Sequence, residues 1–431
     1  MFNATRQIAR DRRDGSAVNE SAQDAVRSLG SLEHLFWLYD QHRFVHFAVT
    51  ALMSGRASPR DWRRALDRLQ KRHPILSVRI DGGRESRPSF RQADATPIPL
   101  RIVVDEPELR WEAEVGHELA TPFDPGQAPL IRAVLIQGAQ DTAFMLVAHH
   151  SIADGLSLAF AIRDTLDALA GRSLRPLSWL PSQDDMMNVS DSPVDGQEQD
   201  QAPAAMPAIY RPRDNARPTV QGLQLSPDLT ARVRDRARLE GTTVHGALCA
   251  ALVLASREVS AAGPEMPLRI VSPINARPLL DVGESCGLFL GIATSVFDGP
   301  AIDFWDIARH VRTDVTANRT SEPIAALLSA FRRVVGNGAD VATVAEFVAK
   351  AFACEVILTN LGSLSFDRRF GPVTLKAMFG PAVLTGFEGQ QTIGVTTVNG
   401  ALGLLHTSHT PAEGLLVKMR SVLAQACDDP A

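Results

Sequence analysis

The sequence predicts an α/β or α+β protein with two core-bearing domains, and three observations support this prediction. Apolar patterns typical of strands and of helices are interleaved in both halves of the chain. The 431 residues suffice for two domains of ordinary size. Residues 181–218 are rich in proline and acidic residues and offer little to bury, so we expect an interdomain linker there.

The first half alternates between the two kinds of element. The predicted helices cover residues 31–40, 58–73, 109–119 and 156–169, and the predicted strands cover residues 44–53, 75–80, 130–136 and 144–148. Ser58 before Pro59 is typical of a helix start, and Pro74 ends the same helix. We expect the polar residues 1–27 to form a mobile arm and residues 28–180 to form the first domain.

The second domain is predicted to cover residues 219–431. Ser226, Pro227 and Asp228 are typical of another helix start. The predicted helices cover residues 226–240, 243–257, 304–317, 341–351 and 411–424, and the predicted strands cover residues 268–271, 287–296, 355–359, 373–377, 392–398 and 402–407.

The composition is that of a soluble globular protein, with 45% hydrophobic and 22% charged residues. A formal net charge of -5 gives no electrostatic reason to expect a nucleic-acid partner. No apolar stretch approaches the roughly 18 residues that a membrane span needs, and the first thirty residues lack the apolar core of a signal peptide. Four widely spaced cysteines fit free thiols in a reducing setting, so we expect a cytoplasmic protein.

Chemically useful residues are concentrated in the segment VAHHSIADGLSL, residues 147–158. A short apolar run ends in His149 and His150, Asp154 and Gly155 follow, and a helical pattern begins directly afterwards. A histidine can take and return a proton near neutral pH, because its unperturbed pKa is about 6.5. Another group must fix its tautomer, and both His149 and Asp154 are within loop reach. A glycine lets a backbone N–H approach a reacting oxygen, so the segment predicts a general base, an orienting group and an oxyanion donor.

Histidine pairs in the sequence do not fit a metal site. Adjacent histidines on a strand, such as His149 and His150, point apart, and His406 and His409 would face opposite sides of a strand. Neither pair has the helical i, i+4 spacing of a zinc site. We therefore expect no metal.

The run His149-His150-Ser-Ile-Ala-Asp154-Gly155 matches HHxxxDG, and on this motif the chain resembles the acyltransferase superfamily of chloramphenicol acetyltransferase. That superfamily includes nonribosomal peptide synthetase condensation domains, plant acyl-CoA-dependent acyltransferases and mycobacterial polyketide-associated acyltransferases. Further segments resemble its "RHP.L", "PFD…PL.R", "P.N.R" and "SNLG" motifs, at residues 69–76, 122–132, 272–278 and 358–362. The resemblance runs from about Leu29 to the C-terminus. The DFGWG motif of the plant branch has no match, which argues against that branch.

The resemblance, rather than the periodicity, implies two similarly folded domains in a V with a tunnel at their interface. It implies that His150 is the general base and that His149 is structural. It favours a structural role for Asp154, paired with Arg277 of the "P.N.R" segment. Gly155 stays open between a backbone oxyanion donor and a turn glycine.

Two asparagines of the second half, Asn275 and Asn360, each follow a predicted strand. Each could line the tunnel, and the alternative for each is an amide that orders its loop.

The function implied by the resemblance is acyl transfer in secondary-metabolite or lipid biosynthesis. The acyl group would move from a thioester, on coenzyme A or a phosphopantetheinyl carrier protein, to a hydroxyl or amine of a small-molecule acceptor. No bound cofactor is implied, and we expect a monomer because the site in this branch lies between domains of one chain. Two alternatives stay open. One is a condensation-fold enzyme for epimerisation or cyclisation, and the other is a catalytically silent scaffold or binding protein.

Overall fold

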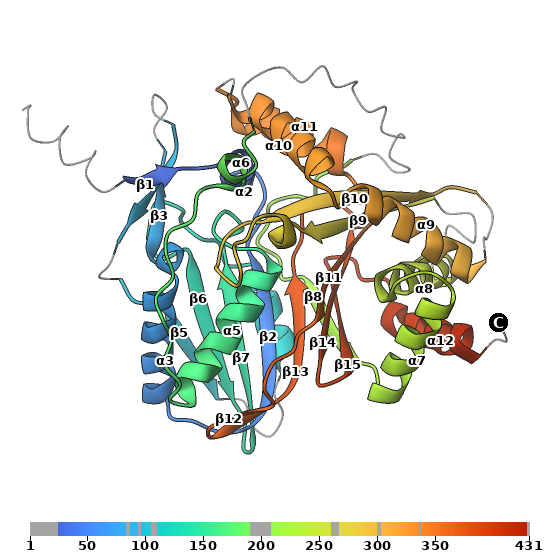
Figure 1. The fold of residues 1–431 in the computed structure, drawn as a ribbon, viewed down its shortest axis with the longest axis horizontal. Helices are drawn as coiled ribbons and strands as arrows, with labels where there is room; N and C mark the ends of the chain where they lie inside the picture. Colours follow the sequence, from blue (N-terminus) through green and yellow to red (C-terminus); the bar gives the residue numbers. More distant parts are fainter. Residues whose placement is uncertain are drawn as a thin grey trace, which may run out of the picture.

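Two six-stranded sheets, each covered by helices, form the body of the protein (Figure 1). The computed structural model describes residues 25–82, 87–93, 96–104, 110–189, 208–259, 267–299, 303–336 and 338–428. A third, three-stranded sheet consists of β1 (Ala25–Ser28), β4 (Ser89–Gln92) and β3 (Val78–Asp81). The mixed α/β class predicted from the sequence is confirmed.

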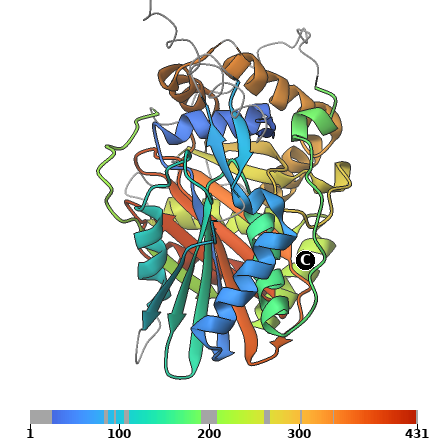
Figure 2. The same ribbon diagram turned by 90° about the vertical axis from the view of Figure 1, so that its left-hand side faces the viewer.

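The first large sheet has the strand order β12-β13-β2-β7-β6-β5. These strands are Arg369–Phe370, Val373–Ala382, Phe47–Gly55, Asp141–Ala148, Ile131–Gln137 and Leu100–Val104. Helices α3 (Pro59–Arg72) and α5 (Gly155–Leu169) pack on one face of this sheet (Figure 2). At this face Trp62 of α3 stacks on Phe144 of β7 at 4.5 Å. As predicted, Ser58 caps α3 by accepting the N–H of Asp61 at 3.2 Å.

The second large sheet has the strand order β10-β9-β11-β14-β15-β8. These strands are Leu290–Phe297, Leu268–Asn275, Val356–Ser363, Gln391–Val398, Ala401–Ser408 and Thr219–Gln224. One face is covered by α7 (Pro227–Leu239), α8 (Val244–Val259), α9 (Phe304–Ala317) and α12 (Leu415–Asp428), which share a core with the strands. Helix α4 (Trp111–Leu119) packs in the apolar cluster that joins the two sheets.

Strand β13 ties the two halves together, because it belongs to the second half of the sequence yet pairs antiparallel with β2. It also lies against β14 and β15 of the other sheet. A Cβ atom added at Gly394 would lie 2.2 Å from the carbonyl oxygen of Pro381, and one added at Gly403 would lie 2.6 Å from that of Met378. The close approach of the sheets therefore requires glycine at both positions. The division into continuous domains 28–180 and 219–431 stays a prediction. The second of these ranges contributes the strands β12 and β13 to the sheet of the first.

Three helices form a layer next to the edge strand β10: α2 (Ser31–Asp40), α10 (Ser321–Gly336) and α11 (Val341–Phe352). Helix α10 was not predicted from the sequence. Its signal is nonetheless present, since Ile324, Leu328, Phe331 and Val335 recur at helical spacing and are buried. Strands β1, β4, β5, β8 and β12 were also not predicted. The predicted strand 75–80 is a 3₁₀ turn, Pro74–Ser77, followed by β3.

Parts of both segments that were predicted to be unstructured are folded. Residues 25–27, assigned to the arm, belong to β1, and residues 1–24 lie outside the described residues. Within the predicted linker, α6 (Gln183–Met186) is folded, and residues 190–207 lie outside the described residues. The Gln183 amide donates to the carbonyl of Leu290 and accepts its N–H, both at 3.0 Å. Packing against β10 therefore orders the start of this segment.

Within the described residues, no single helix is long and apolar enough to span a membrane. Helices α7 and α8 would pass such a test only as a pair, and they are bent by 103° at their junction. All four cysteines are free thiols, as the sequence analysis expected.

Candidate active site

The two motif histidines follow strand β7, which is held on both sides. Ala148, the last residue of β7, pairs with Phe47 of β2 and with Ile131 of β6. The N–H of His149 then donates to the carbonyl of Leu130 at 3.0 Å. The turn that carries both histidines therefore starts from a central strand and not from a free loop.

His150 is oriented by a backbone carbonyl. Its Nδ1 lies 3.0 Å from the carbonyl oxygen of Ala153. A carbonyl oxygen can only accept a hydrogen bond, so the proton of the neutral ring is on Nδ1 and the lone pair is on Nε2. Nε2 makes no hydrogen bond to the described residues. His149 and Asp154 were the groups expected to fix this tautomer, and that expectation was wrong.

Two aromatic rings enclose His150. Phe36 of α2 stacks on it at 4.4 Å with an interplanar angle of 2°, and Phe47 packs at 4.6 Å. Burial lowers the pKa of His150 to about 4, although the negative charge of Asp154 and the hydrogen bond to Ala153 oppose this shift. The side chain keeps partial exposure. The ring is therefore neutral near pH 7, which is the form that a base requires.

His149 points away from His150 and is fully buried. Its Nδ1 accepts the N–H of Ser151 at 3.2 Å, and its Nε2 lies 3.6 Å from Oδ2 of Asp40. Burial would raise the pKa of Asp40, but the interaction with His149 and the hydrogen bond from Val45 outweigh it, and the net shift is downward. These contacts are the kind that a structural histidine makes, and they support the predicted role.

Asp154 is held by hydrogen bonds on both carboxylate oxygens. Oδ1 accepts the N–H of Ser157 at 2.8 Å and caps helix α5. Oδ2 accepts Nη1 of Arg277 at 2.6 Å and the N–H of Phe289 at 3.1 Å. The ion pair with Arg277 that the resemblance implied is thus present. Because both of its oxygens already accept hydrogen bonds, this carboxylate orders the loop and is not free to take a proton from a substrate.

Arg277 connects the motif to the loop before β10. It is 7% exposed, and its Nη2 donates to Oγ of Ser157 at 2.9 Å. Its guanidinium lies over the ring of Phe289, 5.0 Å from the centroid. The carbonyl of Gly287 accepts the N–H of Asp154 at 3.0 Å. Roles for Ser157, Gly287 and Phe289 were not predicted from the sequence. The role of Ser157 could have been recognised from the sequence, because it lies three residues after the helix-capping Asp154.

Gly155, the first residue of α5, lies against the second half of the chain. A Cβ atom added there would lie 2.6 Å from Cγ of Pro381 and 2.7 Å from Cδ2 of Leu361. The close approach of β13 and β11 thus gives a packing reason for glycine. An oxyanion role for its N–H stays a prediction.

We expect Gly155→Ala to lower the free energy of unfolding by about 1–3 kcal/mol, because the added methyl group must displace Pro381 or Leu361. Urea unfolding measures this. Gly336→Ala is the matched control, since no atom lies within 4 Å of a Cβ added at that helical position. Equal stability of the two variants would contradict the packing described here.

Asn275 and Asn360 make the same local contact. Oδ1 of Asn275 accepts the N–H of Arg277 at 3.0 Å, and Oδ1 of Asn360 accepts the N–H of Gly362 at 2.8 Å. A side chain that bonds the backbone two residues on orders a turn. The geometry therefore supports the loop-ordering alternative, and lining of the tunnel stays a prediction.

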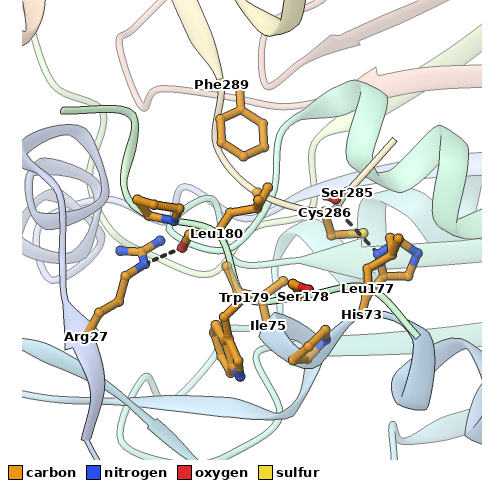
Figure 3. A pocket seen from close by; sticks show the side chains of 13 residues that line it. Arg27, His73, Ile75, Leu177, Ser178, Trp179, Leu180, Ser285, Cys286 and Phe289 are labelled. Carbon is orange, nitrogen blue, oxygen red and sulfur yellow. Dashed lines mark hydrogen bonds between the residues drawn. The ribbon is translucent and has the colours of Figure 1, made fainter. Parts of the chain in front are cut away.

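A cavity of about 340 Å³, measured to its open mouth, has Phe289 in its lining (Figure 3). The N–H of Phe289 bonds the carboxylate of Asp154, so the cavity lies next to the Asp154–Arg277 ion pair. Ile75, Trp179, Leu180, Cys286 and Phe289 are among its lining residues, so it is mainly apolar. His150 does not line it. The arrangement of two domains in a V, with a tunnel at their interface, stays a prediction.

No group of three metal-ligating side chains occurs among the residues that the structure describes. His406 instead places Nε2 2.7 Å from Oε1 of Gln391 and is buried. The expectation that the chain binds neither a metal nor a cofactor stays a prediction.

Comparisons of the sequence match two families on separate parts of the chain. Residues 36–184 match the condensation domain, and residues 214–366 match the phthiocerol/phthiodiolone dimycocerosyl transferase C-terminus. Tyrocidine synthase 3 of Brevibacillus parabrevis is 27% identical over 259 residues, which are 56% of this chain and 4% of that protein. A phosphinothricin tripeptide synthetase of Streptomyces viridochromogenes is 28% identical over 325 residues, 68% of this chain and 29% of the relative. The chain thus spans only a small part of these relatives.

Solved structures match nearly the whole chain. Polyketide synthase associated protein 5 from Mycobacterium tuberculosis has a TM-score of 0.64 at 20% identity, covering 95% of this chain and 99% of the other. The first condensation domain of the calcium-dependent antibiotic synthetase has a TM-score of 0.65 at 18% identity, covering 94% and 98%. Trichothecene 15-O-acetyltransferase from Fusarium sporotrichioides has a TM-score of 0.66 at 12% identity, covering 93% and 94%. These likenesses show the condensation fold.

The HHxxxDG motif, the two family matches and the shared fold agree with one another. The chain resembles condensation domains over residues 36–184 and the phthiocerol/phthiodiolone dimycocerosyl transferase C-terminus over residues 214–366, and its fold is the condensation fold.

Proposed function

We propose that the protein transfers an acyl group from a thioester, on coenzyme A or a carrier protein, to the hydroxyl or amine of a small-molecule acceptor. One observation carries this proposal. His150 keeps its proton on Nδ1, bonded to the carbonyl of Ala153, and leaves Nε2 without a partner among the described residues. A neutral imidazole with a free Nε2 is the group that acyl transfer to a hydroxyl or amine requires.

In this reaction Nε2 of His150 takes the proton of the acceptor as its oxygen or nitrogen attacks the thioester carbonyl. The new C–O or C–N bond forms, the C–S bond breaks, and the proton passes from Nε2 to the leaving thiolate. The positive charge on the ring is transient, and Asp154 lies close enough to favour it electrostatically. The N–H of Gly155 is our candidate donor to the carbonyl oxygen as that oxygen becomes negative.

The names of the similar proteins support the reaction class. They include an acetyltransferase, a dimycocerosyl transferase, a polyketide synthase associated protein and a tripeptide synthetase. We place the reaction in secondary-metabolite or lipid biosynthesis, with a thioester on coenzyme A or a carrier protein as the partner and with the protein acting as a monomer.

A mass-spectrometric transfer assay tests the proposal. Acyl-coenzyme A and acyl-carrier-protein donors are offered in parallel with pooled alcohols and amines to the wild type and to His150→Ala. A product that only the wild type makes would establish the reaction and the donor class. If instead an acceptor returns at unchanged mass with an inverted stereocentre, the epimerisation alternative applies. Absence of product from every donor would favour the scaffold alternative.

The pH dependence of transfer follows from the state of His150. Its pKa is lowered to about 4, so the ring loses its proton well below neutral pH and stays a competent base down to about pH 5. We expect kcat/KM to fall by less than about twofold between pH 7 and pH 5, and to fall about tenfold per unit below pH 4. With the ordinary pKa near 6.5, kcat/KM would already fall about 25-fold between pH 7 and pH 5, and this result would contradict the enclosure of His150 by Phe36 and Phe47.

A further inference from the structure

A second cavity lies at the end of α4, away from His150. It measures about 550 Å³ to its open mouth, and its lining includes Arg43, His46, Arg211, Arg213 and His409. His46 packs against Phe123 at 5.6 Å, and Phe123 packs against His149 at 6.4 Å. The cavity is therefore next to the first histidine of the motif, which faces away from the proposed reaction.

Two arginines of this cavity carry charge that the described carboxylates do not balance. Nη1 of Arg43 donates to the carbonyl of His42, and Nη1 of Arg213 donates to that of Gln41, both at 2.7 Å. Neither guanidinium lies within ion-pair distance of a carboxylate of the described residues. Arg211 differs, because it is paired with Asp214 through two hydrogen bonds of 2.9 Å.

Aromatic faces hold the two unbalanced guanidinium groups in place. Arg43 lies over the ring of Tyr210 at 5.2 Å from the centroid, and Arg213 lies over that of Phe44 at 4.4 Å. Such stacking fixes a guanidinium plane while leaving its edge N–H groups free to donate. Nε of Arg43 is buried and has no hydrogen-bond partner among the described residues.

His46 adds a buried acceptor to the same cavity. It is 2% exposed, and its Nε2 lies 3.0 Å from the carbonyl oxygen of Glu118, so Nε2 carries the proton. Burial, and then the charge of Arg132, lower its pKa to about 4, so the ring is neutral. Nδ1 is therefore a lone pair, and it is buried without a partner among the described residues. A buried acceptor of this kind is costly unless a ligand or water donates to it.

We propose that this cavity binds a small phosphate monoester that carries a hydroxyl group. Arg43 and Arg213 would hold the phosphate, whose charge near -2 at neutral pH matches two guanidinium groups. The ligand hydroxyl would donate to Nδ1 of His46. The proposal does not depend on the acyl-transfer reaction, because it rests on contacts around His46 and not around His150.

Isothermal titration with glycerol 3-phosphate tests the site on the intact chain. The wild type is expected to bind saturably, and Arg43→Ala and Arg213→Ala are each expected to weaken binding by about tenfold or more. Arg234→Ala is the matched control, because Arg234 is 59% exposed on α7 and bonded to its neighbour Asp235. Absence of saturable binding, or equal weakening in the control, would overturn the proposal.

The part played by His46 is tested by changing the ligand, so that a folding defect cannot confuse the result. Propyl phosphate lacks the hydroxyls of glycerol 3-phosphate but keeps the phosphate. We expect the wild type to bind it about fivefold or more weakly, the loss of one hydrogen bond. Glycerate, which replaces the phosphate by a carboxylate, should bind more weakly than glycerol 3-phosphate. Equal affinity for all three compounds would show that neither the hydroxyl nor the phosphate is recognised.

Discussion

Replacement of His150 by alanine is expected to lower kcat/KM for acyl transfer by about 10²–10⁴-fold, the usual contribution of one positioned base. Among the described residues, the variant loses the group at the site whose free nitrogen can take the acceptor proton, because Asp154 is committed to Arg277, Phe289 and Ser157. The measurement is initial rates with the donor and acceptor found in the mass-spectrometric assay.

The fold should survive this substitution. His150 is partly exposed, and among the described residues it contacts two aromatic rings and one carbonyl. The matched control is His149→Ala, which removes a fully buried ring and should reduce the free energy of unfolding by more than His150→Ala does. Turnover by folded His150→Ala at the wild-type rate would reduce His150 to a positioning role.

Arg277→Ala is expected to lower the free energy of unfolding by about 3–5 kcal/mol, because it leaves the buried carboxylate of Asp154 without its cation. The same change removes a hydrogen bond to Ser157 and the ring contact with Phe289, so the loop before β10 should loosen from α5. Urea unfolding measures the loss, and transfer activity should fall with it.

A double-substitution cycle separates the ion pair from general packing. Arg277→Met combined with Asp154→Leu removes both charges, so it should cost less than the sum of the two single changes. Arg277→Lys keeps the charge but not the paired N–H groups, and it should restore only part of the stability. If Arg277→Ala proves as stable as the wild type, the ion pair does not hold the motif loop.

Local patterns predicted what lies within one element or one turn. The capped start of α3, the two strands before the motif and the helix after it depend on spacing and on residues a few positions apart. The Asp154–Arg277 contact joins residues 123 positions apart, and only the resemblance to a known family suggested it. The return of β13 to pair with β2 is equally non-local, and no pattern within β13 indicates it.

Backbone groups account for the remaining differences at the site. The tautomer of His150 depends on the carbonyl of Ala153, and a carbonyl is present at every residue, so the sequence cannot mark it. The hydrogen bonds of Asp154 likewise involve the backbone of Gly287 and Phe289, which reaches the motif from the loop before β10. Side-chain chemistry thus predicted the candidate base, whereas the orientation of that side chain came from the fold.

The most direct measurement of the proposed base is ¹⁵N NMR of histidine-labelled protein, with His150 assigned by the signal lost in His150→Ala. At pH 7 we predict a protonated Nδ1 and an unprotonated Nε2, unchanged down to about pH 5, because burial lowers the pKa of the ring to about 4. A proton on Nε2 at pH 7, or titration of the ring near pH 6.5, would contradict the assignment of His150 as a neutral base with its lone pair on Nε2.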